Sequence, residues 1–236
     1  MQIKTQKTRL FKPNEPLLPF LNTYFGRPKE GDILVVTSKI VALAEGRVVY
    51  NNREQTKIAL IKQESDIALP TKHTWLTLKD GVMMAAAGID ESNANKTLIL
   101  LPKDSFATAK TIQKFFGQKS KLKKLGVLIT DSRCIPLRAG VIGVALGYAG
   151  FKGIKDYRGT PDLFGRKFTI SQVDVADCLA SAAVLLMGEG REKCPIAIIK
   201  NAPVIYTKKI NQQELLIDSK DDMFTPLFAW PQQIRD

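Results

Sequence analysis

The stretch Gly126-Val127-Leu128-Ile129-Thr130-Asp131-Ser132-Arg133 joins an apolar run directly to an acid, a hydroxyl and a base. The apolar part predicts a buried strand, and polar groups at the carboxyl end of such a strand commonly form a site. The oxygens of Asp131 and Ser132 suit a hard cation, and the guanidinium of Arg133 suits a phosphate or a carboxylate. The alternative is that Asp131 and Ser132 only cap the next element.

Other apolar runs predict helices and strands around this strand. Residues 33–36 predict a second buried strand, which ends in Thr37-Ser38-Lys39, and residues 175–187 predict a well-buried helix. Asp104 is a suitable N-cap for a helix that we expect to end at Gly117. The remaining predicted elements include helices at residues 17–25, 40–44 and 55–69 and strands at residues 167–171, 195–199 and 203–206.

The composition is that of an ordinary globular protein with an excess of basic residues. Its 236 residues carry a formal charge of +12, with three cysteines and one histidine, which make neither a disulfide framework nor a zinc motif. No apolar run reaches the roughly 18 residues of a membrane span, and residues 1–8 lack the apolar core of a secretory signal. We therefore expect a cytoplasmic protein with no membrane partner.

The positive charge has three explanations, which are nucleic acid, a small polyanionic substrate and solvated surface lysines. Aromatic interleaving, RNA-recognition signatures and zinc fingers are all missing from the sequence. The case for nucleic acid therefore rests on charge alone, and we do not expect nucleic acid to be the partner.

Three acids, Asp90, Asp131 and Glu189, stand at the ends of predicted elements. Carboxylates from separate elements can converge on Mg²⁺ or Mn²⁺, which in turn bridges nucleotide phosphates. Gly188 and Gly190 flank Glu189 and offer unobstructed backbone N–H groups to phosphate, although Gly188 could simply be a helix C-cap. The common nucleotide motifs and the Gly-x-Ser-x-Gly elbow are absent from the sequence.

Several short motifs follow one another in a fixed order along residues 31–195. They are Gly31-Asp32, Thr37-Ser38-Lys39, Glu45-Gly46, Ala87-Gly88-Ile89-Asp90-x-Ser92-Asn93, Thr130-Asp131-Ser132, Gly140-x2-Gly143, Lys155-Asp156, Asp162-Leu163-x-Gly165-Arg166 and Met187-Gly188-Glu189-Gly190. Together they resemble the coenzyme F420-0:L-glutamate ligase family. The resemblance implies an α+β fold with two mixed α+β subdomains in one catalytic unit over residues 1–236. It also implies an intertwined homodimer.

The same resemblance implies a GTP-dependent γ-glutamyl ligase that adds L-glutamate to a small acidic acceptor and needs Mg²⁺ or Mn²⁺, with K⁺ as a further candidate ion. The positions that match the metal-site motifs are Asp90, Asp131, Ser132 and Glu189. The positions expected to contact the nucleotide are Ser38, Lys39, Asn93, Leu186, Met187, Gly188, Glu189, Gly190, Arg191, Glu192 and Lys193.

Four basic residues are candidates to bind the acidic acceptor and L-glutamate in the catalytic step. They are Arg133, Arg138, Lys155 and Arg166. The alternative for each is an ordinary surface ion pair.

Two rival functions stay open at this stage. The acceptor could be of the folate type, which also ends in a glutamate carboxylate. The chain could instead be a non-catalytic protein that binds a metal and a nucleotide, because Leu43 stands where the family usually has a lysine before Ala-Glu-Gly.

Overall fold

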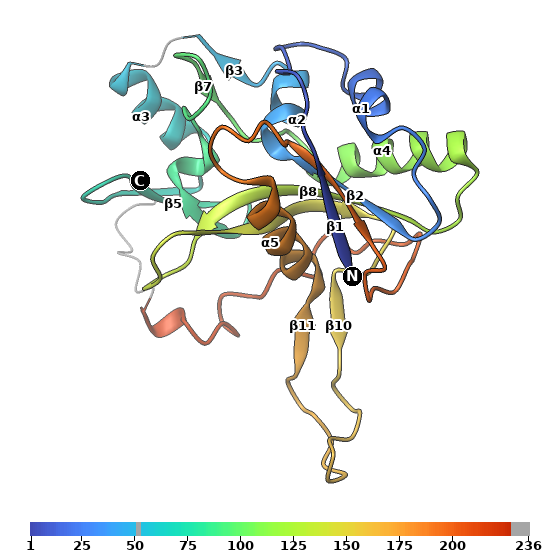
Figure 1. The fold of residues 1–236 in the computed structure, drawn as a ribbon. Helices are drawn as coiled ribbons and strands as arrows, with labels where there is room; N and C mark the ends of the chain where they lie inside the picture. The colour runs from blue at the N-terminus through green and yellow to red at the C-terminus, as the bar shows by residue number, and fades with distance from the viewer. Residues whose placement is uncertain (51–52, 228–236) are drawn as a thin grey trace.

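The computed structural model describes residues 1–50 and 53–227, and it has a mixed α+β fold around a five-stranded sheet (Figure 1). The strands lie in the order β1 (Gln2–Gln6), β12 (Ile196–Lys200), β2 (Asp32–Thr37), β8 (Leu125–Cys134) and β9 (Val141–Ala149). β2 and β8 are parallel, whereas the other neighbouring pairs are antiparallel. No helix in the described residues is long and apolar enough to cross a bilayer.

Helices cover both faces of this sheet, and the alternation of side chains along β2 explains how. Ile33 and Val35 pack with α5 (Val175–Met187), while Leu34 and Val36 pack into the opposite layer. Because both faces are buried, the strand reads as a continuous apolar run rather than an alternating one. The opposite layer consists of α1 (Leu17–Phe25), α2 (Ser38–Ala44) and α4 (Ser105–Ser120).

A smaller lobe lies beside the sheet, and an arm projects away from it (Figure 1). The core of the lobe contains Ile61, Leu98 and Leu100. The lobe comprises β3 (Val48–Val49), α3 (Glu54–Gln63), β4 (Ile67–Pro70), β5 (Trp75–Lys79), β6 (Val82–Ala85), the short helix η1 (Ala86–Gly88) and β7 (Leu98–Ile99). The arm is built on β10 (Ile154–Asp156) and β11 (Gln172–Asp174), and a further short helix, η2, spans Thr225–Leu227.

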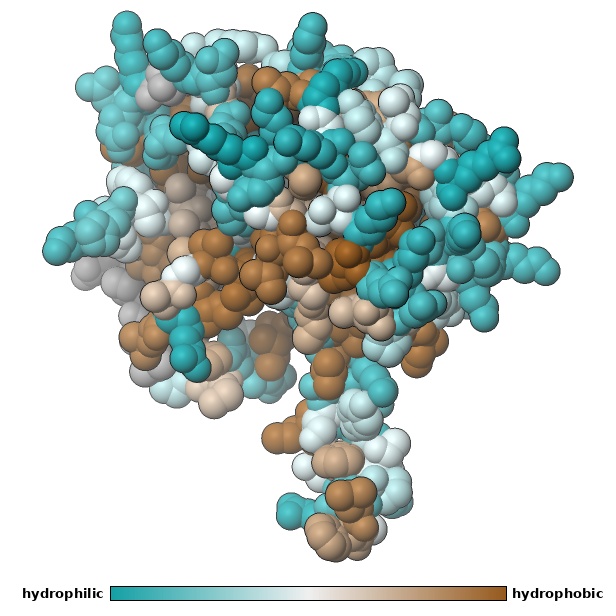
Figure 2. Space-filling model, viewed as in Figure 1, coloured by the Kyte–Doolittle hydropathy of each residue, from teal (hydrophilic) through white to brown (hydrophobic). Residues whose placement is uncertain are grey.

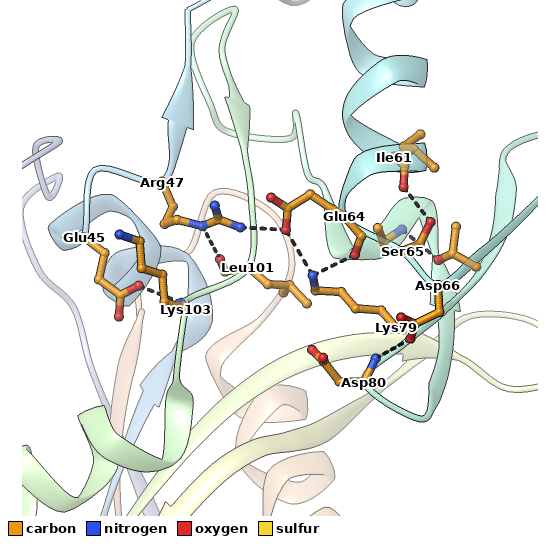
Figure 3. A network of polar contacts seen from close by, with 12 residues as sticks. Glu45, Arg47, Ile61, Glu64, Ser65, Asp66, Lys79, Asp80, Leu101 and Lys103 are labelled. Carbon is orange, nitrogen blue, oxygen red and sulfur yellow. Dashed lines mark hydrogen bonds and ion pairs between the residues drawn. The ribbon is translucent and has the colours of Figure 1, made fainter.

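A polar network joins the smaller lobe to the segment that follows β7 (Figure 3). The carboxylate of Glu64 accepts hydrogen bonds from Arg47 Nη2 at 2.7 Å and from Lys79 Nζ at 3.0 Å. Arg47 Nε also donates to the carbonyl of Leu101 at 3.0 Å. The network therefore fixes the backbone at Leu101, a residue that lines both cavities described below.

The strand at the centre of the sequence analysis is longer than expected. β8 continues through Asp131 to Cys134, because β9 pairs with it along that whole length. The register shifts between Ile129 and Thr130, which marks a β-bulge. A bulge turns the following side chains relative to the sheet, so the polar residues lie within the strand and still reach a cavity.

Other predicted elements are correct in kind but differ in extent. The helix predicted for residues 55–69 ends at Gln63, because residues 67–70 pair with β5 as β4. Gly117 does not end its helix, which continues to Ser120 and stops where Lys121 takes a left-handed conformation with φ 55°. The predicted strands at residues 167–171 and 203–206 are wrong, since each segment contributes only an isolated bridge, Lys167 to Pro161 and Tyr206 to Phe151.

Candidate active site

The first cavity lies where β2 passes into α2, beside the bulged part of β8 and the end of α5. It has a volume of about 330 Å³, and we call it the β2 cavity. Of the residues predicted to bind metal or nucleotide, it is lined by Ser38, Lys39, Asp90, Asn93, Asp131, Ser132, Met187, Gly188, Glu189, Gly190, Glu192 and Lys193. The structure therefore brings predicted residues from four separate segments of the chain to one place.

Asp131 is the most enclosed acid of the β2 cavity. Its Oδ1 accepts a hydrogen bond from Ser38 Oγ at 3.1 Å, which links β8 to the first residue of α2. Burial raises the pKa of the Asp131 carboxyl group above its usual value, although Ser38 and the charge of Arg133 act in the opposite direction. Burial therefore outweighs the contacts that favour the ionised form of Asp131.

Asp90 is held in place by both its backbone and its side chain. Its N–H and C=O groups pair with Ile99, and its carboxylate accepts from the backbone N–H of Ser92 at 2.6 Å. Lys39 Nζ lies 2.7 Å from Asp90 Oδ2 and also donates to the Ser92 carbonyl at 2.8 Å. Burial opposes ionisation of Asp90, but the contacts with Lys39 and Ser92 outweigh it and lower the pKa of this carboxyl group.

The loop after α5 closes the cavity from the other side. Gly188 ends α5 with φ 78°, so it is the helix C-cap that the simpler alternative predicted, and it also lines the cavity. Ser132 Oγ donates a hydrogen bond to Glu189 Oε1, and Asn93 Nδ2 donates to the Gly190 carbonyl at 3.3 Å. These two contacts tie the loop to β8 and to the smaller lobe.

The backbone beside Asp90 is held in a conformation that most residues avoid. Ala86 and Ala87 have φ of 49° and 52°, and Gly88 has φ of 72°. A Cβ atom on Gly88 would lie 2.5 Å from Leu101 Cγ, so only glycine fits there. Strain of this kind persists where the surrounding structure imposes it, often at functional sites.

The predicted metal ligands can be judged by their donor chemistry. In residues 1–50 and 53–227, no three His, Cys, Asp or Glu side chains are grouped closely enough to hold a metal ion. Asp90, Asp131, Ser132 and Glu189 nevertheless line one cavity and present only oxygen, which Mg²⁺ and Mn²⁺ prefer. Thr130 Oγ1 is also buried beside them without a hydrogen-bond partner in the described part of the chain. The donor set therefore fits a hard divalent cation if the acids draw closer together.

The remaining predicted residues lie outside the β2 cavity. Leu186 and Arg191 do not line it, although they are close in sequence to residues that do. Arg138 is exposed in the turn between β8 and β9. Lys155 lies on β10 with Nζ 4.8 Å from the centre of the Tyr157 ring, and Arg166 is exposed on the arm.

Arg133 lines a second cavity of about 400 Å³, which we call the α5 cavity because Asp174 and Asp177 at the start of α5 also line it. The two acids were missed in the sequence analysis. Their spacing is typical of a helix N-cap, and Asp174 does accept a hydrogen bond from the Asp177 backbone N–H at 2.9 Å. The long-range contact that could have identified them, Ala145 N–H to Asp177 Oδ1 at 2.7 Å, has no local sequence signal.

Comparison with known proteins matches the chain to one family model, described as F420-0:Gamma-glutamyl ligase, over residues 7–201. Among its relatives is a protein of Methanococcus maripaludis strain C6, named coenzyme F420:L-glutamate ligase. It is 33% identical over 214 residues, which cover 83% of this chain and 86% of that protein. All residues that line the β2 cavity lie inside the matched range.

Two further relatives carry the same name. The protein of Methanothermobacter thermautotrophicus is 34% identical over 193 residues, which cover 74% of this chain and 76% of that protein. The protein of Methanocaldococcus jannaschii is 31% identical over 214 residues, which cover 83% of this chain and 85% of that protein.

Proposed function

Because this chain belongs to the F420-0:γ-glutamyl ligase family, we propose that it is an acid–amino-acid ligase that joins L-glutamate to the carboxylate of coenzyme F420-0 at the expense of GTP. The observation that carries the proposal is the composition of the β2 cavity. Four acids, five hydroxyl side chains and two lysines from distant segments line it, and this donor set suits a metal–nucleotide complex. The description of the family model supplies F420-0 as the acceptor, and the relatives' names supply L-glutamate.

The proposed reaction has two steps. An oxygen of the acceptor carboxylate attacks the γ-phosphorus of GTP, which gives an acyl phosphate and GDP. The amine of L-glutamate then attacks the acyl carbon, an amide bond forms, inorganic phosphate leaves and the amine loses its proton. Catalysis of phosphoryl transfer consists mainly of positioning and neutralising charge, so the chain needs fixed cations and donors rather than a nucleophile.

Residues of the β2 cavity are suited to these tasks. Lys39 offers an ammonium group that is already fixed by Asp90 and Ser92. Gly188 and Gly190 carry no Cβ atom, so the loop backbone can approach a phosphate closely, although their N–H groups already donate to the Val184 carbonyl at 2.9 Å and to Glu192 Oε2 at 2.7 Å. Asn93 fixes this loop through the Gly190 carbonyl. We assign these residues to the nucleotide.

Asp90, Asp131, Ser132 and Glu189 would hold Mg²⁺ or Mn²⁺. A bound divalent cation would neutralise charge on the transferring phosphoryl group and favour the ionised form of Asp131, which burial opposes. K⁺ stays a further candidate ion, and no residue of the cavity singles it out.

The arm supports the expected homodimer. Leu163 and Phe164 are 97% and 95% exposed in the loop between β10 and β11, and Figure 2 shows apolar side chains at the end of the arm. Exposed apolar side chains on a projecting segment are typical of a surface that another chain covers. A second subunit is also the route by which Lys155 or Arg166 could approach a β2 cavity.

The position of Leu43 bears on the rival, non-catalytic function. Its side chain packs against the core shared by α1, α2 and α4, and Leu43 lines neither cavity. Leucine at this position therefore gives no reason to infer that phosphate binding is lost. A folate-type acceptor and a non-catalytic role are retained as outcomes of the test.

The test is a turnover assay with the purified chain, Mn²⁺ or Mg²⁺, L-glutamate, either GTP or ATP, and either F420-0 or tetrahydrofolate, read by mass spectrometry. We expect F420-0 to gain the mass of one glutamate residue with GTP. A mass gain on tetrahydrofolate alone would identify a folate-type acceptor in place of F420-0. No mass gain on either acceptor would refute the ligase assignment.

A further inference from the structure

The α5 cavity is lined by one buried cation, Arg133, and two acids, Asp174 and Asp177, that form no ion pair with it. Arg133 Nε is buried and has no hydrogen-bond partner, and no ion pair of the described residues includes Arg133. Arg133 lines the same cavity as Asp177, and it also lies two residues along β8 from Asp131. A buried guanidinium with unused donors is costly unless something supplies acceptors.

The two acids each have one oxygen already committed. Asp174 Oδ1 accepts from the backbone N–H of Asp177, and Asp177 Oδ1 accepts from the backbone N–H of Ala145. Burial, followed by the charge of Asp177, raises the pKa of Asp174 to about 6. Neither acid forms an ion pair with a basic side chain of the described residues, which leaves the pair suited to receive a positive group.

The rim of the cavity adds a second free cation. Lys103 is exposed there, and its ammonium group makes no hydrogen bond or ion pair with the described residues, whereas Lys79 is already bound to Glu64. Asp80 and Asp104 also lie at the rim, and Asp104 is occupied as the N-cap of α4.

We infer that the α5 cavity binds an acidic amino acid as its zwitterion, with Arg133 and Lys103 holding the two carboxylates and Asp174 and Asp177 holding the ammonium group. The ligand would give partners to Arg133, Lys103, Asp174 and Asp177, while the carboxylate of Asp80 stays at the rim. The volume of the α5 cavity, about 400 Å³, lies within the usual range for small-molecule sites.

The position of this cavity suits a co-substrate of the β2 cavity. Ser132 and Arg133 are neighbours on β8, and Ser132 lines the β2 cavity while Arg133 lines the α5 cavity. Leu101 lines both. The choice of L-glutamate as the amino acid rests on the proposed ligase function, whereas recognition of a zwitterion rests on the charges alone.

The first test measures binding of L-glutamate to the purified wild-type chain by calorimetry, in parallel with glutarate, which lacks the ammonium group, and 4-aminobutanoate, which lacks one carboxylate. We expect glutarate and 4-aminobutanoate each to bind at least about tenfold more weakly, since a hydrogen bond to a charged group contributes roughly 1.5–3 kcal/mol. Equal binding of L-glutamate and glutarate, or no binding of L-glutamate, would overturn the inference. This measurement needs no turnover, so it separates the inference from the ligase assignment.

The second test uses the variants Arg133→Gln and Asp177→Asn, with Arg27→Gln and Asp221→Asn as matched controls at exposed positions that line neither cavity. Asn keeps an oxygen for the Ala145 N–H, and thermal melting confirms that each variant is folded. We expect KM for L-glutamate to rise about tenfold or more in both test variants while KM for the nucleotide changes less than about twofold. An unchanged KM for L-glutamate in an active enzyme would refute the site and leave the ligase assignment standing.

Discussion

Lys39 Nζ lies 2.7 Å from Asp90 Oδ2, so one of the predicted metal ligands is paired with a lysine of its own cavity. The pair joins the first turn of α2 to the loop after η1. A fixed cation beside an acid both holds that acid ionised and orients the cation for an incoming phosphate.

Replacing Lys39 with Gln should raise the pKa of Asp90, because burial then acts without the opposing charge. In the wild type, the lowered pKa of Asp90 stabilises the folded state at every pH above the pKa that Asp90 has in the unfolded chain. This stabilisation is lost as the pH falls through the pKa of Asp90 in the folded state. Carboxyl NMR titration of Asp90 measures the shift, and we also expect KM for GTP to rise. An unchanged Asp90 titration would show that the ion pair does not persist in solution.

Replacing Asp131 with Asn should abolish stabilisation by Mn²⁺. A cation that binds only the folded state contributes about 2.7 kcal/mol at a concentration one hundred times its Kd, which is several degrees of melting temperature for a chain of this size. We expect this gain in the wild type and in the exposed control Asp221→Asn, and its loss on adding a chelator. An equal gain in Asp131→Asn would exclude Asp131 as a ligand.

Replacing Asp174 with Asn should change how stability depends on pH. The folded pKa of about 6 is raised above the usual value, so the group stabilises the fold at low pH and this contribution is lost as the pH rises through 6. Asn keeps the cap to Asp177 and cannot ionise. The variant should therefore melt higher than the wild type at pH 7.5 but not at pH 3, which lies below the ordinary value of 3.8. An equal difference at both pH values would contradict the burial of this charge.

Replacing Glu64 with Gln should destabilise the smaller lobe, because Arg47 and Lys79 both lose their charged acceptor. The Glu64 side chain is only 15% exposed, so we expect a loss of about 2 kcal/mol in the free energy of unfolding. Urea denaturation measures it. The control Glu91→Gln breaks the more exposed pair with Lys57, and we expect less than about 1 kcal/mol there. Equal losses would show that the network in Figure 3 has no special role.

Elements whose sequence signal is local were predicted correctly. The bounds of α1 and α5 and the N-cap at Asp104 agree with the prediction, because apolar spacing and capping are properties of short segments. The acids of the β2 cavity were also identified, since each lies beside a recognisable motif. The division into subdomains stays a prediction.

Features that depend on distant pairing could not be predicted. β8 extends past Asp131 only because β9 pairs with it, and a hydrophobic pattern does not record that partner. The same pairing places Ala145 against Asp177 and so assembles the α5 cavity. Lys155 and Arg166 are the opposite case, because recognisable motifs suggested that they belong to the site. The arm nevertheless holds both residues outside both cavities.

Oxygen transfer from the acceptor tests the proposed ligase reaction as a whole. F420-0 labelled with ¹⁸O in both oxygens of its carboxylate is incubated with the enzyme, GTP, Mn²⁺ and L-glutamate, and the phosphate and the product are analysed by mass spectrometry. An acyl phosphate requires one ¹⁸O atom to appear in inorganic phosphate for each amide formed. Amide formation with unlabelled phosphate would contradict the proposed mechanism, and release of phosphate without any amide would contradict the assignment as a ligase.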